Sequence, residues 1–384
     1  MEKRYFANIG KEISLLGFGL MRLPLSDPES SVVDYPTAEK MIALALERGI
    51  NYFDTGWFYL EGKSERFAGD ALSKFPRESF YLATKMPAWM VESPEGAESL
   101  FAEQLRRCQT DRFDFYLCHN LGGGNYDIAR KHRVIEFLNR KKKEGVIGHL
   151  GFSLHDGPER LRQLLDNHEW DFAQIQLNYI DWESQDAKSL YELLAERSLP
   201  VVVMEPVRGG VLANLPAAAA DILVKVDEKA SQASWAIRFA ASLPGVMTVL
   251  SGMSTLSQME DNLNTMTNFQ PLSEAEIATL QQTATAYRSS GVIRCSGCRY
   301  CMDCPSGVEI PRVFAAYNHC RNMPAEKPGL IEWVFRCGYL SLNEHERAHN
   351  CTDCGRCIEL CPQRIDIPKH MKEIARFATE TIKY

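Results

Sequence analysis

Apolar runs alternate with amphipathic segments over the first 270 residues of the chain. Runs such as PVVVM at 200–204 and VMTVL at 246–250 are mostly apolar, which is typical of parallel strands buried on both faces. The segments between these runs repeat their apolar residues at helical spacing. The pattern predicts eight strands, the first ending near Gly19 and the others at 50–55, 80–86, 113–119, 146–153, 172–179, 200–207 and 246–252.

A helical segment follows each predicted strand, at 37–48, 64–74, 94–107, 128–143, 158–167, 186–197, 229–242 and 255–266. Eight strand–helix units close most economically into a (β/α)8 TIM barrel of the α/β class. An open, doubly wound sheet is the alternative, but GFGLMR at 17–22 lacks the GxGxxG spacing of such a sheet's first unit. A short hairpin that turns at Gly10-Lys11 is expected before the first strand.

A further helix near 273–288 leads from this barrel into a tail of different composition. Ten of the 12 cysteines lie beyond residue 290, and helical patterns there cover 312–320 and 330–338. Such cysteine density indicates disulfides or metal, and the absence of a leader argues against disulfides. We therefore expect a barrel at 1–290 and a small, mainly α-helical metal domain at 291–384.

Charge and hydropathy exclude several classes of partner. The formal net charge of −7 argues against nucleic acid, since phosphate binding needs a clustered positive surface. The sequence has no apolar run of ~18 residues, so no membrane span is expected. The first residues, MEKRYFANIGKEIS, lack the apolar core of a signal peptide. These features predict a cytoplasmic protein without a nucleic-acid or membrane partner.

Four polar residues fall at the ends of adjacent predicted strands. Asp54 and Tyr59 follow the second strand, Lys85 ends the third and His119 ends the fourth. Catalytic groups of (β/α)8 barrels lie at the C-terminal strand ends, so we expect these four at one mouth. A tyrosine with a pKa of ~10 is a weak acid at pH 7, and a nearby ammonium lowers that pKa. Asp54 would hold Lys85 charged, and His119 would donate a hydrogen bond to a carbonyl oxygen.

The sequence around these positions resembles the aldo/keto reductase superfamily. The resemblance rests on FDT-x3-Y at 53–59, ATK at 83–85 and LCHN at 117–120. It extends to GFGLMR at 17–22, GFS at 151–153, QIQLN at 174–178 and SGMSTLSQMEDN at 251–262. It implies that Asp54, Tyr59, Lys85 and His119 form a catalytic tetrad. It also implies that a nicotinamide cofactor over the barrel mouth delivers hydride to a small-molecule carbonyl substrate.

The same resemblance implies the cofactor-binding residues. Ser153 and Gln174 match the pair that hydrogen-bonds the nicotinamide carboxamide, and Asn178 would line the same pocket. The adenosine half would lie on a segment after the last strand, with Asn262 reading the adenine. The remaining expected cofactor contacts are Met21, Arg22, Met204, Ser254 and Gln258.

Two features depart from the family pattern. Met204 stands where many relatives stack an aromatic ring on the nicotinamide. Gly252, Met253 and Gln258 stand where relatives place Lys or Arg on the 2′-phosphate, so the choice between NADP and NAD stays open. The loop GGGNYD at 122–127 lies at the same rim without Walker spacing, and a flexible substrate loop or a plain turn would fit it.

The tail holds two cysteine runs, CSGCRYCMDCP from Cys295 and CTDCGRCIELCP from Cys351. The second is the C-x2-C-x2-C-x3-C-P run of bacterial ferredoxins, whereas zinc ribbons use two separated C-x2-C pairs. The first run is one residue shorter before its last cysteine. Both runs end alike, in CPSGVEIP at 304–311 and CPQRIDIP at 361–368, which indicates an internal repeat. The pattern favours iron–sulfur clusters over zinc.

Over about 291–375 the tail resembles helical, ferredoxin-like domains with two clusters. The resemblance implies two [4Fe–4S] clusters, one on Cys295, Cys298, Cys301 and Cys361, the other on Cys351, Cys354, Cys357 and Cys304. Cys320 and Cys337 are expected to be buried thiols, with service as a substitute ligand as the alternative. Cys108 and Cys118 are expected in the barrel core.

Three hypotheses follow for the whole chain. It is a nicotinamide-dependent carbonyl reductase assisted by clusters, a redox enzyme that couples the clusters to a substrate through a flavin, or an electron-transfer or sensing module with an idle barrel. Hydride carries two electrons and a cubane carries one, so direct exchange needs an intermediary such as flavin. No flavin motif is visible, although barrels bind flavin without one. A redox partner protein is a further candidate.

Overall fold

The computed structural model describes residues 1–27, 31–267, 269–321 and 328–382. The chain divides into two compact units. Unit 1 comprises Met1–Val207 and Ala233–Leu272, and unit 2 comprises Arg208–Gln232 and Ser273–Tyr384. The boundary expected near residue 290 falls inside unit 2, directly after helix α12 (Glu274–Ser289). A division into 1–290 and 291–384 stays a prediction.

Within the described residues, eight parallel strands of unit 1 close into a barrel, which confirms the predicted (β/α)8 fold. Their order around the barrel is β10-β11-β12-β3-β6-β7-β8-β9. The strands are β3 (Leu16–Gly19), β6 (Tyr52–Asp54), β7 (Tyr81–Met86), β8 (Phe113–Cys118), β9 (Ile147–Leu154), β10 (Phe172–Gln176), β11 (Val201–Met204) and β12 (Val246–Ser251). Two antiparallel pairs lie outside the barrel, β1 (Lys3–Phe6) with β2 (Lys11–Ser14) and β4 (Leu25–Asp27) with β5 (Val32–Val33).

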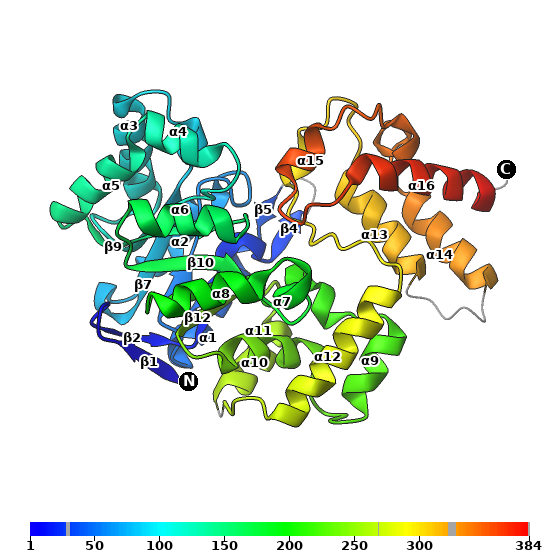
Figure 1. Ribbon diagram of the computed structural model, residues 1–384, viewed down its shortest axis with the longest axis horizontal. Coiled ribbons are helices and arrows are strands. Elements are labelled where there is room, and N and C mark those ends of the chain that lie inside the picture. The colour runs from blue at the N-terminus through cyan, green and yellow to red at the C-terminus, as the bar shows by residue number, and fades with distance from the viewer. Residues whose placement is uncertain (28–30, 268, 322–327, 383–384) are drawn as a thin grey trace. The chain divides into compact units, whose positions relative to one another are not determined.

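Helices surround these strands (Figure 1). They are α1 (Tyr35–Glu47), α2 (Lys63–Leu72), α3 (Pro94–Arg107), α4 (Asn125–Lys131), α5 (Val134–Lys143), α6 (Pro158–Asn167), α7 (Asp181–Ser184), α8 (Ala187–Glu196), α10 (Gln232–Ser242) and α11 (Leu256–Thr267). The prediction of one helix over 128–143 is wrong. The chain divides there into α4 and α5 because Arg133 takes a left-handed conformation with a φ of 55°.

Packing at the barrel's N-terminal end explains the hairpin and one glycine. Ile9 and Ile13 of the hairpin belong to a buried cluster with Tyr52 and Phe172. A Cβ on Gly151 would lie 2.7 Å from both the ring and the carbonyl oxygen of Phe172, so only glycine permits this approach of β9 to β10. The approach places Ser153, two residues further along β9, beside Gln174 of β10.

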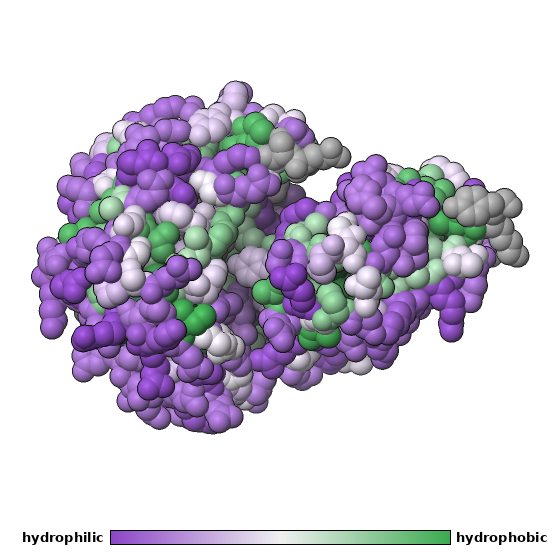
Figure 2. All heavy atoms as spheres, turned by 90° about the horizontal axis from the view of Figure 1, so that it is seen from above, coloured by the Kyte–Doolittle hydropathy of each residue, from purple (hydrophilic) through white to green (hydrophobic). Residues whose placement is uncertain are grey.

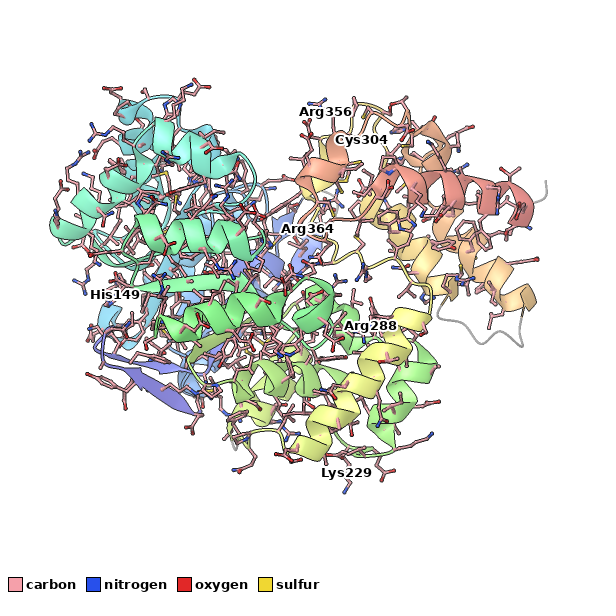
Figure 3. The ribbon with its side chains drawn as sticks, viewed as in Figure 1. His149, Lys229, Arg288, Cys304, Arg356 and Arg364 are labelled. Atoms are coloured by element: carbon pink, nitrogen blue, oxygen red, sulfur yellow. The ribbon has the colours of Figure 1, made fainter. Side chains whose placement is uncertain are left out.

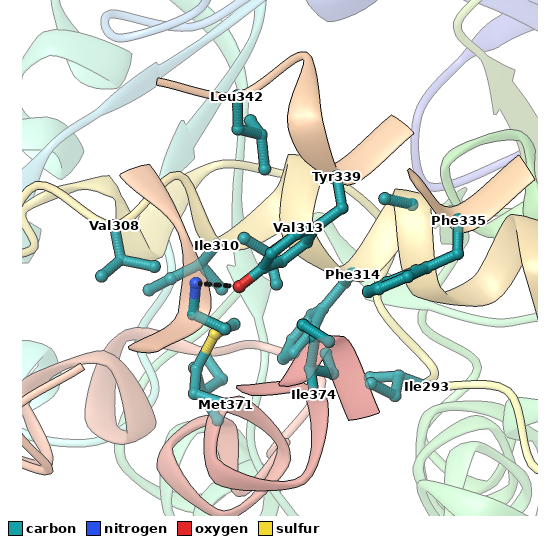
Figure 4. Packing of buried hydrophobic residues seen from close by; sticks show 14 of the residues in the cluster. Ile293, Val308, Ile310, Val313, Phe314, Phe335, Tyr339, Leu342, Met371 and Ile374 are labelled. Atoms are coloured by element: carbon teal, nitrogen blue, oxygen red, sulfur yellow. Dashed lines mark hydrogen bonds between the residues drawn. The ribbon is translucent and has the colours of Figure 1, made fainter. Parts of the chain in front are cut away.

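The described part of unit 2 is mainly helical and has its own core. Its helices are α9 (Ala217–Val224), α12, α13 (Ile310–Arg321), α14 (Pro328–Leu340), α15 (Arg356–Leu360) and α16 (Ile367–Thr381). Helices α13 and α14 confirm the predictions for 312–320 and 330–338, whereas the sequence-based prediction lacks α9 and α16. Phe314, Phe335 and Met371 pack in the core, where the Tyr339 hydroxyl accepts a hydrogen bond from Ala348 N at 3.0 Å (Figure 4).

The face in Figure 2 is mostly hydrophilic, with hydrophobic side chains in small scattered areas. Of the helices in the described ranges, none is long and apolar enough to cross a membrane.

Candidate functional site

The four residues of the expected tetrad lie at the C-terminal ends of three adjacent barrel strands. Asp54 is the last residue of β6, and Tyr59 follows in the next loop. Lys85 lies near the end of β7, and His119 comes directly after β8. Since β6, β7 and β8 are neighbours in the barrel, their strand ends bring these side chains to one rim.

An ion pair organises this rim. The Lys85 ammonium donates to Asp54 Oδ1 at 2.6 Å and to the Thr55 carbonyl oxygen at 2.7 Å. Lys85 Nζ lies 4.8 Å from the Tyr59 ring centroid, and the Tyr59 and His119 rings meet edge to face at 6.2 Å. Asp54, Lys85 and His119 are buried, and Tyr59 is 9% exposed. The tetrad side chains therefore form one contiguous group.

Burial dominates the protonation of the group. It lowers the pKa of Lys85 and raises that of Asp54, and the contact between the two opposes both shifts. Burial, then the Asp54 and Glu205 carboxylates, raise the pKa of Tyr59 well above its ordinary value. The expectation of a lowered Tyr59 pKa is therefore wrong for this structure, and the phenol stays protonated at neutral pH. Burial and Lys85 hold the pKa of His119 well below its ordinary value, so its imidazole is neutral.

A buried hydrogen-bond network backs the ion pair. Glu65 Oε1 on α2 accepts from Thr84 Oγ1 at 2.7 Å and from Gln104 Nε2 at 2.6 Å. The same amide nitrogen lies 3.0 Å from the Lys85 carbonyl oxygen. The network fixes the end of β7 and hence the direction of Lys85. The sequence does not reveal it, because α2 and α3 meet only in the folded barrel.

The expected nicotinamide pair lies on neighbouring strands, β9 and β10. Ser153 Oγ accepts from Asn120 N at 2.8 Å. Gln174 Nε2 donates to Met204 Sδ at 3.6 Å, and Gln174 Oε1 is buried without a hydrogen-bond partner among the described residues. That amide oxygen is thus available to a donor such as a carboxamide N–H.

Asn178 differs from this pair because its amide is fully engaged within the protein. Its Nδ2 donates to Asp181 Oδ2 at 2.6 Å and to the Glu205 carbonyl oxygen at 3.0 Å. Its Oδ1 accepts from the backbone N–H groups of Ile180 and Asp181. An amide offers two donors and two acceptor positions, so Asn178 holds the turn after β10. A contact to the cofactor stays a prediction.

The expected adenosine segment follows β12. Ser254 Oγ donates to the Arg22 carbonyl oxygen at 2.7 Å, and Gln258 Oε1 accepts from Ser254 N at 2.8 Å. Asn262 is buried and donates to Ser251 Oγ at 2.9 Å. Arg22 and Met21 lie in the short helix Leu20–Arg22 after β3, and the Arg22 side chain lies 3.3 Å from the position of a Cβ on Gly252. Met253, next to Gly252 in this segment, is buried.

Two further rim residues are missing from the sequence prediction. Glu205, directly after β11, has a left-handed φ of 55° and pairs with Arg22 at 3.7 Å. Strained backbone of this kind concentrates at functional sites. Trp89 lies 5.1 Å from the His119 ring and stacks on Phe58 at 5.7 Å. A single Trp or Glu in a loop has no sequence pattern that would place it at the rim.

The glycine-rich loop 122–127 leads into α4, which begins at Asn125. Gly123 N donates to Asp156 Oδ2 at 2.9 Å. A turn of this kind fits the local structure, and a substrate-binding role stays a prediction.

Eight tail cysteines of unit 2 line two hollows. The first hollow, of about 310 Å³, is lined by Cys295, Cys298, Cys301 and Cys361. The second hollow, of about 370 Å³, is lined by Cys304, Cys351, Cys354 and Cys357. Both volumes include open solvent. Figure 3 labels Cys304 and Arg356, which line the second hollow near α15. The two groupings coincide with the two ligand sets that the ferredoxin resemblance implies.

Thiol chemistry in these hollows fits iron–sulfur clusters. Burial and the neighbouring cysteines of its own hollow raise the pKa of Cys357 to about 11 and that of Cys301 further. Four thiolates that line one hollow repel each other unless a metal binds them. Across the described ranges, no group of three or more His, Cys, Asp or Glu side chains is close enough to hold a metal ion. The two sets of four thiols each line a hollow.

The remaining cysteines divide between core and surface. Cys108, Cys118 and Cys320 are buried, and the Cys320 thiol donates to the Tyr317 carbonyl oxygen. The expectation for Cys337 is wrong, because this residue of α14 is exposed. Cys320 and Cys337 are absent from the lining of either hollow.

Comparison with known proteins finds two family matches along the chain. Residues 15–285 match the model of the aldo/keto reductase family, and residues 294–367 match that of a 4Fe-4S dicluster domain. The uncharacterized oxidoreductase YqkF of Bacillus subtilis is 27% identical over 312 residues, which are 73% of this chain and 96% of that protein. L-galactose dehydrogenase of Arabidopsis thaliana is 25% identical over 294 residues, 71% of this chain and 90% of that protein.

Solved structures show the same relationship. The holo form of an aldo-keto reductase from Bacillus halodurans has a TM-score of 0.61 and 28% identity, over 74% of this chain and 97% of that one. An aldo-keto reductase from Klebsiella pneumoniae, in complex with NADPH, has a TM-score of 0.60 and 20% identity. The match covers 73% of this chain and 95% of that one. Because the first family model spans most of the chain, the protein belongs to the aldo/keto reductase family, as an NAD(P)-dependent oxidoreductase with a C-terminal 4Fe-4S dicluster domain.

Proposed function

We propose that the barrel reduces a small-molecule carbonyl, or oxidises the corresponding alcohol, through the tetrad of Asp54, Tyr59, Lys85 and His119. The observation that carries this proposal is the buried contact of 2.6 Å between Lys85 Nζ and Asp54 Oδ1, beside the Tyr59 ring. An ion pair withdrawn from water is costly unless it serves a precise arrangement. Here it fixes an ammonium next to a phenol that is protonated at neutral pH.

Each residue has a distinct task in the reduction. The carbonyl oxygen binds between the Tyr59 hydroxyl and a neutral His119, which orients it by a hydrogen bond. A bound reduced nicotinamide supplies the hydride for the carbonyl carbon. Tyr59 gives its proton to the oxygen, so the product is a neutral alcohol. Lys85 stabilises the resulting phenolate until solvent returns the proton, and Asp54 holds Lys85 in place.

The same proposal assigns the cofactor contacts. Gln174 Oε1, buried without a partner among the described residues, would accept from the carboxamide, with Ser153 on the neighbouring strand. The rim segment with Arg22, Ser254 and Gln258 would hold the adenosine half, with Asn262 behind it. NAD and NADP both fit this assignment.

We further propose that unit 2 binds two [4Fe–4S] clusters that serve electron transfer or partner docking, outside the hydride step. Two separate sets of four cysteines support two clusters. The tetrad residues belong to unit 1, and all eight cysteines belong to unit 2. The two chemistries therefore have separate ligands and separate cores.

Hydride transfer is tested with nicotinamide cofactor carrying deuterium at the reactive carbon and a reactive carbonyl such as nitrobenzaldehyde. Anaerobically purified full chain should place the label on the alcohol carbon. An alcohol without the label, together with a flavin spectrum that survives cluster removal, would replace this proposal by flavin chemistry.

Cluster content is tested by anaerobic iron and sulfide assays. About eight of each per chain are expected from two four-iron clusters. Four of each would leave one hollow without a cubane, and zinc at similar stoichiometry would remove the ferredoxin interpretation.

A further inference from the structure

The two cysteine hollows repeat one local contact. Ser296 follows the first cysteine of its run, and its Oγ lies 3.4 Å from Gln363 Nε2. Thr352 follows the first cysteine of the other run, and its Oγ1 lies 3.3 Å from Ser306 Oγ. Ser306 and Gln363 hold the same place in CPSGVEIP and CPQRIDIP. The two contacts are therefore equivalent parts of the internal repeat.

The surroundings of the two contacts differ. Ser296 is 3% exposed and Gln363 is 6% exposed, whereas Thr352 is exposed and Ser306 is half-buried. Ser296 and Gln363 also line the first hollow. The repeat thus has one buried half and one half that is open to solvent.

Arg208 contacts the buried half of the repeat. Its side chain is fully buried, and its Nη2 donates to Gln363 Oε1 at 2.6 Å. Its Nη1 donates to the Arg294 carbonyl oxygen at 2.8 Å. Arg294 directly precedes Cys295, and Gln363 is two residues beyond Cys361. Each hollow also has one exposed arginine in its lining. Arg299 in the first is 56% exposed and pairs with Glu309, and Arg356 in the second is 58% exposed and pairs with Asp303. Arg208 has no counterpart among the residues that line the second hollow.

We propose that Arg208 is a positioning residue for the cluster in the first hollow, and that it raises the reduction potential of that cluster relative to the other. This inference rests on the proposed pair of clusters. The planar guanidinium bridges the two segments that supply Cys295 and Cys361, which one rigid fork of donors does better than a flexible ammonium.

The charge of Arg208 supports the second part of the proposal. A cluster gains one negative charge when it accepts one electron, and net charge, hydrogen bonds and exposure set its potential. A buried positive charge stabilises the reduced form far more than an exposed one, because water screens the exposed charge. The exposed Arg299 and Arg356, one in each lining, are screened alike. The buried Arg208 is the difference, so the first cluster should be the easier to reduce.

The experiment compares Arg208→Met and Arg208→Lys with wild type in the full chain. Each protein is purified anaerobically, assayed for iron and titrated with dithionite under electron paramagnetic resonance. In Arg208→Met one midpoint should fall by ~59 mV, a tenfold change in the ratio of oxidised to reduced cluster, while the other stays. If that variant instead loses a cluster, its iron should fall by half.

Arg208→Lys keeps the positive charge and changes the geometry of the donors. It also keeps the test informative if the Met variant does not fold. It should keep the midpoint near the wild-type value and show weaker iron retention. Arg347→Met is the matched control, because Arg347 donates to the Leu342 carbonyl oxygen and lies outside both hollow linings. Cys354→Ser changes a cysteine of the second hollow. The midpoint that it alters therefore belongs to the cluster in that hollow.

The outcomes distinguish a failure of this inference from a failure of the proposed pair of clusters. A wild type with four irons contradicts the two-cluster function. A wild type with eight irons, whose two midpoints stay unchanged or shift together in Arg208→Met, overturns the role of Arg208. A midpoint shift that Cys354→Ser assigns to the second hollow overturns it as well.

Discussion

The barrel rim and the cysteine hollows differ in how far the protein alone satisfies their polar groups. At the rim, Lys85 already has Asp54 Oδ1 and the Thr55 carbonyl oxygen as acceptors. In the hollows, neighbouring thiols raise each other's pKa, as at Cys357, and only a metal centre can stabilise them together as thiolates. The ion pair at the rim is therefore satisfied by the protein alone, whereas the thiols of the hollows would be satisfied by the proposed clusters. Changes at the two places should therefore have different consequences.

Tyr59→Phe should have the largest effect, because it removes the proton donor and leaves the rim's ion pair intact. We expect kcat for carbonyl reduction to fall by ~10²–10⁴, with the nicotinamide Kd within a few-fold. Lys85→Met should behave similarly. Steady-state kinetics measures kcat, and fluorescence titration measures the Kd of the nicotinamide cofactor.

The control for this change is Tyr52→Phe on β6, the strand that precedes the loop with Tyr59. The Tyr52 hydroxyl is buried without a hydrogen-bond partner among the described residues, so its removal should leave kcat unchanged. Activity retained in Tyr59→Phe on every carbonyl tested would refute the tetrad mechanism.

Cys301→Ser should separate the two regions. The change removes a ligand from the first hollow, so iron should fall by about half, since each cluster holds four irons. Unit 2 should unfold at lower temperature, because metal binding and folding are coupled. The kcat/KM for carbonyl reduction should stay within about threefold, since the tetrad's hydrogen bonds lie within unit 1.

Cys337→Ser, at the exposed thiol outside both hollow linings, should retain all iron. If Cys301→Ser abolished turnover while nicotinamide still bound, the clusters would belong to the catalytic path.

Gln174→Leu should weaken the nicotinamide complex by roughly five- to tenfold, the cost of one hydrogen bond of ~1–1.5 kcal/mol. The change keeps the side-chain volume and removes the amide oxygen offered to the carboxamide. Isothermal titration calorimetry with oxidised and reduced cofactor measures this change in affinity. Gln163→Leu on the exposed face of α6 is the control, and equal affinity in both variants would show that Gln174 is not a cofactor ligand.

The last expected effect concerns stability and not activity: a loss of stability in acid at His155, directly after β9. Burial holds the pKa of His155 to about 4, whereas an unfolded histidine titrates near ~6.5. Between these values the unfolded state binds the extra proton, so the free energy of unfolding should decrease as pH falls from ~6.5 toward 4. Denaturant unfolding of His155→Asn should show a shallower decrease over this window. His319→Asn, at an exposed histidine, should retain the wild-type slope, and equal slopes in both would contradict the assignment.

The sequence predicts the barrel well because strands buried on both faces leave apolar runs that no other element explains. It also places Asp54, Lys85 and His119 together, because the ends of adjacent parallel strands share one rim. It fails at Arg133, where a left-handed residue without glycine splits a continuous helical pattern. Glu205 and Arg208 escape it because their partners are distant in sequence and both residues have a positive φ. Helix α16 was within reach, since Ile367, Met371, Ile374 and Ala378 are spaced for one helix face.

The discontinuity of unit 2 also matters for how the chain is made. Arg208 and Gln363 are separated by 155 residues, and chains grow at roughly 5–20 residues per second. Arg208 therefore emerges about 8–31 s before its acceptor on that estimate. During this interval an arginine destined for full burial has no Gln363 to accept its hydrogen bond. Segment 208–232 of unit 2 is therefore synthesised well before residues 273–384, which complete that unit.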